Sequence, residues 1–221
     1  MMIVCANTKG GVGKSTIAVH LAAWLHDQGF KTALLDCDKQ RSSSEWIAEV
    51  DSGITVRTAD TPEACLAEAT ELTRTHDCLV GDGPGGLDDL SRTMLLLADL
   101  ALLPISPSIL DLRSVQQATG ILRYAQQING GRPEGRLVLN KMKTRDTISR
   151  ELRNAAPELG VQVAEHVIRD LQAYRDAAQQ GTVVTRMGKK GAQAASDMTQ
   201  LFTELTGTLI TQLKQKEVAN G

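Results

Sequence analysis

The feature that most constrains this chain is a glycine-rich run close to its N-terminus. It follows a short apolar segment, precedes a stretch of helical period, and reads Thr8-Lys9-Gly10-Gly11-Val12-Gly13-Lys14-Ser15-Thr16. Glycines let successive backbone N–H groups turn inward on phosphate oxygens, and the N-terminus of the following helix adds its dipole. Lys14 supplies a point charge, and the Ser15 hydroxyl can ligate Mg²⁺. The run therefore predicts a phosphate-binding loop between a strand and a helix.

Short apolar runs alternate with longer stretches of helical period, which is typical of a parallel sheet covered on both faces. The expected strands are Met2–Asn7, Thr32–Asp36, Ile54–Arg57, Cys78–Asp82, Leu100–Ile105, Arg136–Asn140 and Val161–Ile168. The expected helices are Ser15–Gln28, Gln40–Val50, Pro62–Arg74, Asp88–Ala98, Leu110–Ile128, Thr147–Ala156, Leu171–Gln179 and Gly191–Lys216. The predicted fold class is α/β, a doubly wound and mostly parallel sheet. Without linkers or repeats, the 221 residues predict one domain over 1–221.

Composition excludes several classes of protein. Aromatic residues make up 3% of the chain, too few for a base-stacking platform that binds single-stranded nucleic acid. The four cysteines are well separated and form no C-x-x-C pair, so neither a zinc site nor a disulfide framework is indicated, and a reducing cytoplasm is expected. No leader pattern or apolar run of spanning length is present, so we expect neither secretion nor a membrane span.

With Lys9 before the glycines, the run matches K-G-G-x-G-K-[ST], the deviant Walker A form, although Thr8 stands where the generic pattern has Gly. The chain resembles the ParA/MinD family of deviant Walker A ATPases over nearly its whole length, and most closely its small, ParF-like members. The resemblance implies a P-loop NTPase fold, ATP and Mg²⁺ as cofactors, and slow hydrolysis stimulated by a partner. It implies nucleotide contacts for Lys9, Gly10, Gly11, Val12, Gly13, Lys14, Ser15 and Thr16, with Lys9 and Lys14 also catalytic.

Carboxylates after two further strands fit the same family. Asp36 and Asp38 lie in a segment that resembles the family's D-x-D-P-Q, with Lys39 in place of proline. The resemblance implies that Asp38 positions the attacking water and that Asp36 lies near the metal, whereas two acids capping the following helix are the alternative. Asp82 ends a strand that resembles a Walker B strand. It is expected to hold Mg²⁺ together with Ser15, and a solvated acid at a strand end is the alternative.

The base site is expected at the ends of the last strands. Asn140 stands where the family places an adenine-contacting asparagine, and Lys143 occupies the position at which an N-K-x-D motif needs its guanine-binding carboxylate. Adenine is therefore favoured over guanine. Ile168, Arg169 and Asp170 resemble the family segment that flanks the base, although a plain strand end would explain them equally well.

Three functional classes of protein share this type of nucleotide site: metabolic or electron-transfer enzymes, MinD-like ATPases and ParA-type ATPases. A metabolic or electron-transfer relative is disfavoured, because no cysteine follows Cys78 to ligate an iron–sulfur cluster and because Lys9 is unusual in the synthetases. A MinD-like membrane-cycling ATPase is the alternative to a ParA-type ATPase. The terminal helical segment is amphipathic, but its polar side is rich in Thr and Gln, with Lys214 and Lys216 as its basic residues, so membrane binding is not expected.

A ParA-type ATPase that segregates or positions a DNA or protein cargo is the function we expect. The resemblance implies an ATP-dependent sandwich homodimer in which Lys9 reaches the partner's nucleotide, although a solvated loop lysine would look the same. It also implies a ParB-like or adaptor protein and a cytoplasmic, nucleoid-associated location. Whether the cargo is a plasmid, a chromosome or a protein assembly stays open.

Two basic clusters predict contacts with double-stranded DNA without sequence preference. Arg150 and Arg153 lie one turn apart on an expected helix, and Arg186, Lys189 and Lys190 precede the terminal helix without an acid between them. Both clusters are expected to project outward toward phosphates, with salt-sensitive binding. A solvated basic face is the alternative.

Overall fold

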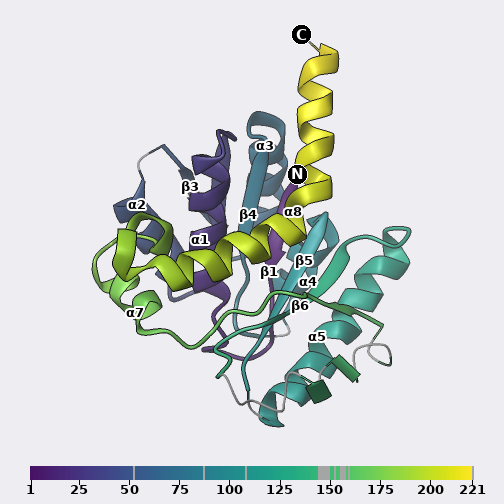
Figure 1. Cartoon of the computed structure of the whole chain (residues 1–221). Helices are drawn as coiled ribbons and strands as arrows, with labels where there is room; N and C mark the ends of the chain where they lie inside the picture. Colours follow the sequence, from purple (N-terminus) through teal and green to yellow (C-terminus); the bar gives the residue numbers. More distant parts are fainter. Residues whose placement is uncertain are drawn as a thin grey trace.

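A seven-stranded sheet forms the centre of the computed structural model, which describes all residues except 52, 87, 108, 144–149, 152, 155–157, 159 and 221 (Figure 1). The strands lie in the order β3-β2-β4-β1-β5-β6-β7, and each neighbouring pair is parallel. Their bounds are β1 Met2–Cys5, β2 Thr32–Asp36, β3 Thr55–Thr58, β4 Cys78–Asp82, β5 Leu100–Ile105, β6 Glu134–Leu139 and β7 Gln162–Val163. The predicted α/β class with a parallel sheet is confirmed.

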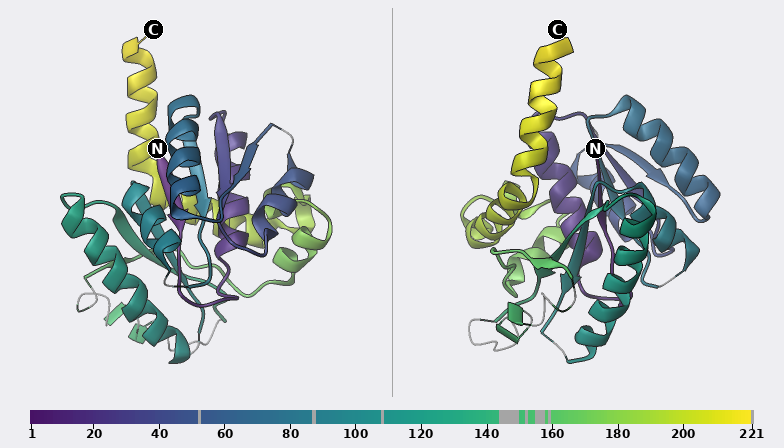
Figure 2. Two further views of the ribbon diagram at one scale, coloured as in Figure 1. Left: turned by 180° about the vertical axis from the view of Figure 1, so that it is seen from behind. Right: turned by 90° about the vertical axis from the view of Figure 1, so that its right-hand side faces the viewer.

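Helices cover both faces of the sheet (Figure 2). Their bounds are α1 Lys14–Asp27, α2 Ser42–Val50, α3 Pro62–Thr75, α4 Asp89–Leu97, α5 Ile109–Ile128, α7 Gln172–Gln179 and α8 Ala192–Asn220, with 3₁₀ turns η1 Val184–Arg186 and η2 Gly188–Lys190. Side chains of α1, α2, α7 and α8 share one apolar core, and those of α3, α4 and α5 share the other. Successive residues of β1 alternate between these cores, with Ile3 in the first and Val4 in the second. Burial on both faces explains why the strands are apolar throughout rather than alternating.

Two sequence predictions were wrong in their bounds for identifiable reasons. The helix expected from Gln40 begins at Ser42, because the Gln40 N–H donates to the Asp38 side chain and Arg41 has a φ of 54°. The strand expected over Val161–Ile168 is reduced to β7. Its pairing is interrupted because the Glu165 and His166 N–H groups donate to the Glu204 carboxylate of α8, and it resumes where the Ile168 N–H donates to the Leu139 carbonyl oxygen of β6.

The expected helix over Thr147–Ala156 lies mostly outside the described residues, although residues 150, 151, 153 and 154 are helical. Helix α8 crosses the face of the molecule and then turns, so that its C-terminal half projects from the body (Figures 1 and 2). Within the described residues, no helix combines the length and the apolar character that crossing a membrane requires.

The connectivity brings the chemical motifs to one edge of the sheet. From β1 the chain passes through α1 to β2, and β2, β3 and β4 all lie on one side of β1. After β4 it crosses to β5, which lies on the other side of β1. Parallel strands all present their carboxyl ends at the same edge, and a ligand binds where the strand order reverses in this way. The loops after β1, β2, β4 and β6 therefore surround a common space.

Candidate nucleotide-hydrolysing site

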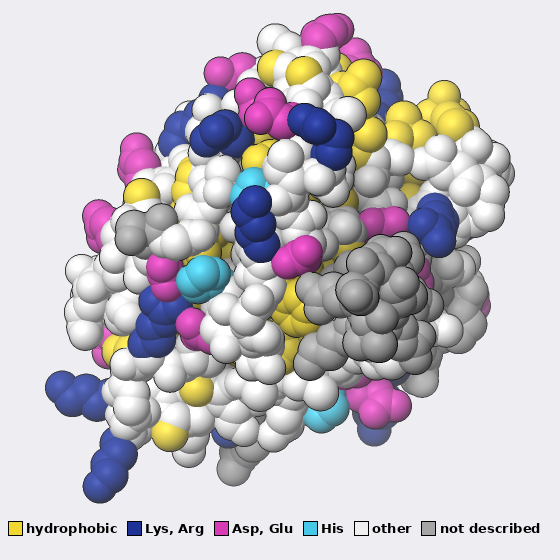
Figure 3. All heavy atoms as spheres, turned by 90° about the horizontal axis from the view of Figure 1, so that it is seen from above, with side chains coloured by type: hydrophobic (Ala, Val, Ile, Leu, Met, Phe, Trp, Pro, Cys, Tyr) yellow, Lys and Arg dark blue, Asp and Glu magenta, His cyan; other side chains and the backbone are white. Residues whose placement is uncertain are grey.

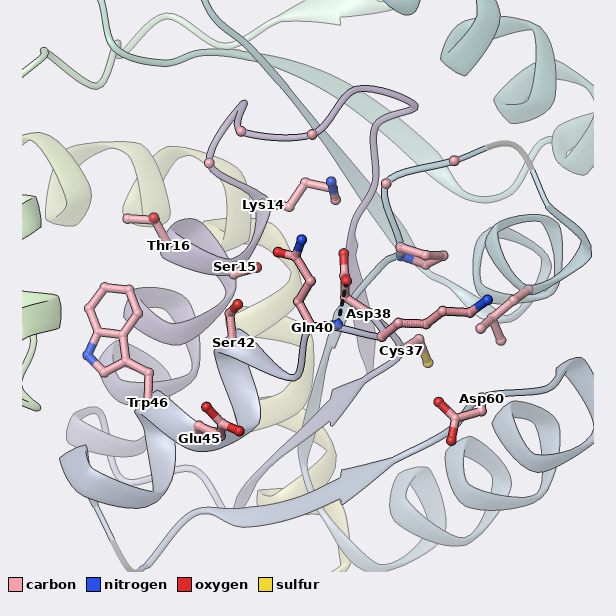
Figure 4. A pocket seen from close by; sticks show the side chains of 18 of the residues that line it. Lys14, Ser15, Thr16, Cys37, Asp38, Gln40, Ser42, Glu45, Trp46 and Asp60 are labelled. Atoms are coloured by element: carbon pink, nitrogen blue, oxygen red, sulfur yellow. Dashed lines mark hydrogen bonds between the residues drawn. The ribbon is translucent and has the colours of Figure 1, made fainter.

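A cavity of about 1160 Å³ opens at this edge of the sheet. Its walls are the glycine-rich loop, the loop after β2, the loop after β4 and parts of α2 (Figure 4). The predicted site residues that line it are Gly10, Gly11, Gly13, Lys14, Ser15, Thr16 and Asp38. Three distant stretches of sequence thus meet around one space, as the motifs predicted.

The glycine-rich loop is shaped by its glycines. Gly11 and Gly13 have φ values of 75° and 99°, in the left-handed region where a side chain is costly. A Cβ atom on Gly13 would also collide with the amide nitrogen of Asn140. Helix α1 starts immediately afterwards with Lys14, whose side chain is buried in the loop and whose Nζ lies 3.4 Å from the Lys9 carbonyl oxygen. The loop directs backbone N–H groups and one cation at a common centre.

The end of β6 holds this loop from the other side. The Asn140 side chain donates to the Val12 carbonyl oxygen at 2.7 Å, and Lys141 Nζ donates to the Gly11 carbonyl oxygen at 2.6 Å. Lys141 has a φ of 57°, unusual for a residue with a long side chain. Asn140 was predicted to contact adenine; the structure gives its amide an additional partner in the loop itself.

Asp82 is the strongest indication of a cation site. Both carboxylate oxygens are buried without a hydrogen-bond partner among the described residues. Burial raises the pKa of this carboxyl group to about 6. The nearby Asp36 charge raises it further, whereas the Ser15 and Ser43 hydroxyls and the Lys14 charge lower it. A buried carboxylate without partners is costly unless a cation compensates it. Its oxygen, with the Ser15 hydroxyl, is the kind of ligand that Mg²⁺ prefers, so these two residues fit the predicted metal.

Asp36 makes contacts that the sequence did not predict. Its two carboxylate oxygens accept from the backbone N–H groups of Asp38 and Ser44, both at 2.9 Å. Its backbone carbonyl accepts from Arg41 Nη1 at 2.7 Å. These bonds hold the loop between β2 and α2, so Asp36 shapes this loop. Its charge also acts on the nearby Asp82 carboxyl group, and its place near the metal stays a prediction. Arg41, which also pairs with Asp60, was missed because no motif spacing marks it.

Asp38 is held in the cavity by the loop that Asp36 shapes. Its carboxylate accepts from the Gln40 N–H at 2.9 Å and points in the direction of Lys14 (Figure 4). The side chain is half-buried, so one oxygen is held by protein while the group still faces the cavity. This position fits the predicted role of orienting a water molecule.

The segment expected to flank the base, residues 168–170, is held against α8 by hydrogen bonds. The Arg169 guanidinium and backbone N–H donate to the Asp197 carboxylate, at distances from 2.7 to 3.2 Å. Ile168 is buried, and Asp170 accepts from Arg175. Asn140 and these three residues do not line the described cavity, so the base would lie beside it.

Arg186 is exposed, as expected, but its guanidinium is engaged within the protomer. Its guanidinium donates to the Asp27 and Asp51 carboxylates, each at 2.7 Å, and to the Val50 carbonyl oxygen at 2.9 Å. These groups neutralise its charge and join η1 to the ends of α1 and α2. Neither the charge count nor the spacing could reveal acids that lie more than a hundred residues away in the sequence.

The other predicted DNA contacts are exposed but belong to two separate places. Lys189 and Lys190 lie on η2 near α2 and α7, whereas the helical residues 150, 151, 153 and 154 lie near α5 at the other side of the molecule (Figure 1). Arg153 also donates to the Glu165 carbonyl oxygen at 3.0 Å. The face in Figure 3 shows basic and acidic side chains interspersed rather than one basic patch.

A site that presents backbone N–H groups and a lysine to phosphates, and a buried carboxylate to a cation, is that of a P-loop nucleoside triphosphatase. Comparison with known families narrows this class. Residues 3–212 match the CobQ/CobB/MinD/ParA nucleotide binding domain, so the chain belongs to this family. It is an ATPase of the ParA/MinD type with the deviant Walker A loop.

Individual relatives cover almost all of the chain. The chain is 30% identical over 209 residues to maintenance of carboxysome distribution protein A from Halothiobacillus neapolitanus, a match that spans 92% of this chain and 95% of the relative. The fold is similar to that of MinD from Pyrococcus horikoshii complexed with Mg-ADP, with a TM-score of 0.75, 20% identity, and 94% and 97% of the two chains covered. A Cyanothece McdA complex with ATP has a TM-score of 0.72 at 16% identity, covering 93% and 96%.

Proposed function

We propose that the chain is a ParA-type positioning ATPase that distributes a large protein assembly over the nucleoid. The observation that carries the proposal is the buried Asp82 at the end of β4, whose carboxylate has no hydrogen-bond partner among the described residues. It lies next to Ser15, which follows the glycine-rich run that begins with Lys9. A metal ion with a bound triphosphate would supply partners for Asp82 and Ser15. Lys9 is the additional lysine that marks proteins of this type, which use ATP to switch between assembly states. The likeness to a carboxysome distribution protein supports a protein assembly as cargo rather than a plasmid.

Hydrolysis then follows from the positions of the side chains. Lys14 and the loop N–H groups compensate the phosphate charge, while Asp38, held by the Gln40 N–H, orients the attacking water. Bound Mg²⁺ supplies charge neutralisation at the phosphates. Asp82 and Ser15 would hold it. Because phosphoryl transfer depends mainly on positioning, the Asp36 contacts that shape the Asp38 loop also contribute to the rate.

Dimerisation is assigned to Lys9. Its backbone carbonyl lies 3.4 Å from Lys14 Nζ, it stands directly before the glycines that line the cavity, and it is partly exposed. This placement supports a role toward the nucleotide of a second protomer. Two facing triphosphates repel each other, and a cation from each protomer would compensate that repulsion.

DNA binding is assigned to Lys189 and Lys190, with Arg150 and Arg153 as a second, separate set. All four are exposed, whereas Arg186 is engaged within the protomer. A two-fold dimer would double each small set, so that affinity for phosphates depends on ATP. The adaptor protein that stimulates hydrolysis stays unidentified.

Light scattering with MgATP tests the dimer, using Lys9→Ala and the matched control Lys31→Ala, an exposed lysine at the start of β2. We expect dimers for the wild type and the control and monomers for Lys9→Ala, with nucleotide binding retained. Equal dimer fractions in all three would contradict the role of Lys9. Asp38→Ala should bind MgATP but hydrolyse it on the order of a hundred-fold more slowly.

Deletion of the gene in its own host tests the cargo. We expect protein assemblies, followed with a fluorescent subunit, to cluster or to be inherited unevenly, and Asp38→Ala to fail to rescue them. Loss of plasmids with normally spaced assemblies would overturn the choice of cargo while leaving the ATPase assignment intact.

A further inference from the structure

Two cysteine side chains meet beside the catalytic loop. Cys37 follows β2 directly, between Asp36 and Asp38, and Cys65 lies in the first turns of α3. Their sulfur atoms are 4.0 Å apart and buried in the same apolar core, although the residues are 28 positions apart in the sequence. All four cysteines of the chain are free thiols. Their sequence spacing gave no sign of this pair.

We propose that Cys37 and Cys65 are a modification site at which a hydroperoxide forms a reversible disulfide, and that this bond arrests ATP hydrolysis. A disulfide needs a sulfur–sulfur distance of about 2.05 Å. Starting from 4.0 Å, each sulfur has to move by about 1 Å, which rotation about a Cα–Cβ bond can provide. The rest of the fold can therefore stay in place while the bond forms.

The oxidant can reach this pair through the nucleotide cavity. Both cysteines are buried, with Cys37 1% and Cys65 0% exposed, but Cys37 is one of the residues that line the cavity and Cys65 is not. A small neutral hydroperoxide that enters the cavity therefore meets Cys37 first. The second thiol is already within reach, so the first oxidation product can be captured before it reacts further.

The chemistry balances with the hydroperoxide as the oxidant. The Cys37 sulfur gives up its proton and attacks one peroxide oxygen, which breaks the O–O bond and leaves a sulfenic acid and one molecule of water or alcohol. The Cys65 sulfur then attacks the Cys37 sulfur, the S–O bond breaks, and a second water leaves with the Cys65 proton. Two thiols lose two electrons in total, and the peroxide gains them.

The position of the pair explains why the bond would affect catalysis. The Cys37 N–H donates to the Asp82 carbonyl oxygen at 2.9 Å, and Asp38 is the next residue in the chain. The loop that follows is held by hydrogen bonds and one ion pair, through Asp36, Arg41 and Asp60. A covalent bond to α3 would restrict the adjustment that Asp38 needs when MgATP binds. Misplacement by about 1 Å can reduce a rate on the order of a hundred-fold.

The other two cysteines provide an internal control. Cys5 on β1 and Cys78 on β4 are equally buried, but they belong to the core on the opposite face of the sheet. Cys78 has no place in the nucleotide site, so Cys78→Ala is a matched control for Cys65→Ala on α3.

The test treats the nucleotide-free full chain with hydrogen peroxide, removes the oxidant, and measures both ATP hydrolysis and disulfide content. In the wild type and Cys78→Ala we expect a Cys37–Cys65 peptide by mass spectrometry and an ATPase rate lowered on the order of ten-fold or more. Dithiothreitol should restore both. Cys65→Ala should form no such disulfide, and dithiothreitol should not restore any rate that it loses, because its Cys37 sulfenic acid is left to oxidise further.

Two results would overturn the proposal. The first is the absence of a Cys37–Cys65 peptide when Met oxidation shows that the oxidant acted. The second is a quantitative disulfide that leaves ATP hydrolysis unchanged. If Cys65→Ala does not fold, the wild type alone still tests the proposal, because dithiothreitol should remove the disulfide and restore the ATPase rate together. Cargo positioning plays no part in this test, so its failure would leave the proposed function untouched.

Discussion

Lys141 Nζ donates a hydrogen bond to the carbonyl oxygen of Gly11 at 2.6 Å, across 130 positions of sequence. The neighbouring Asn140 amide bonds the Val12 carbonyl oxygen in the same way. Both residues follow β6, so the end of one strand fixes two carbonyl groups of the phosphate-binding loop. The N–H groups of that loop are thereby left to face phosphate.

Loss of this contact should weaken nucleotide binding. For Lys141→Ala we expect an ATP dissociation constant raised about five-fold, because an exposed charged hydrogen bond contributes about 1 kcal/mol. Lys31→Ala, at an exposed lysine directly before β2, is the control and should bind normally. Titration of a fluorescent ATP analogue measures both. Equal affinities in the two variants would show that Asn140 holds the loop alone.

Asp82→Asn should make the nucleotide-free protein more stable and less able to bind MgATP. Burial raises the pKa of this carboxyl group to about 6, so its charged form at pH 7.5 costs stability, on the order of 2 to 3 kcal/mol. The neutral amide avoids this cost. Thermal unfolding with a chelator should show a higher Tm for the variant, whereas Mg²⁺-dependent ATP binding should be lost. A lower Tm would mean that a partner already compensates the carboxylate.

Much of this site was predictable from sequence, and what was missed has a common cause. The glycine-rich loop follows from its spacing next to an apolar strand, whereas Asp38 and Asp82 follow from the resemblance of their segments to the family's motifs. The strand order brings all of them to one edge of the sheet. The Cys37–Cys65 pair and the ion pairs of Arg186 depend on contacts between residues far apart in the chain. The roles of Asp36 and Arg41 depend on which backbone groups the loop leaves unpaired, which the spacing does not specify.

His20 should make stability depend on pH. Its ring bonds the Thr16 carbonyl oxygen at 2.7 Å, accepts from the Val184 N–H at 3.2 Å, and lies edge-on to Trp46 and Tyr174. Burial lowers the pKa of His20 to about 4, whereas the unfolded chain has about 6.5. The unfolded state binds more protons between these values. The contribution, about 3 kcal/mol, is therefore complete above pH 6.5 and is lost as pH falls to 4.

Chemical unfolding from pH 4 to pH 7.5 tests this expectation. His20→Gln should show a flatter stability profile than the wild type, whereas His76→Gln, a partly exposed control, should keep the wild-type slope. Other carboxylates contribute equally to all three proteins, so the difference between the profiles isolates His20. Parallel profiles for His20→Gln and the wild type would mean that the ring is not held neutral by burial.

Substitutions at Arg186 and at Lys189 and Lys190 should have different effects: the first should lower stability, and the second should lower DNA affinity. Arg186→Ala breaks two ion pairs with partly exposed groups, so we expect a loss of about 1 kcal/mol in stability and little change in DNA affinity. The Lys189→Glu/Lys190→Glu variant should fold normally and lose ATP-dependent binding to duplex DNA. In the wild type, log affinity should fall by about 0.9 per phosphate contact for each decade of salt. Unchanged DNA affinity in the double variant would place the site elsewhere, with Arg150 and Arg153 next to be reversed.

The contact between Arg169 and Asp197 should contribute to binding of the adenine base but not to binding of the phosphates. Asp197 on α8 holds both the guanidinium and the backbone N–H of Arg169, in the segment we expect beside adenine. Asp197→Asn weakens this hold, so ADP affinity should fall about five-fold, in line with about 1 kcal/mol for a partly exposed charged pair. Inorganic tripolyphosphate should bind as before, because the glycine-rich loop is untouched.

Competition against a fluorescent nucleotide measures both ligands, with Asp176→Asn on α7 as the control because that carboxylate accepts from Gln172 within its own helix. An equal loss for ADP and tripolyphosphate would show that α8 supports the whole site. Unchanged ADP affinity would instead remove residues 168–170 from the base site. Only a loss confined to ADP agrees with a base that lies against residues 168–170, which Asp197 of α8 holds in place. Nucleotide binding would then be coupled to the position of α8.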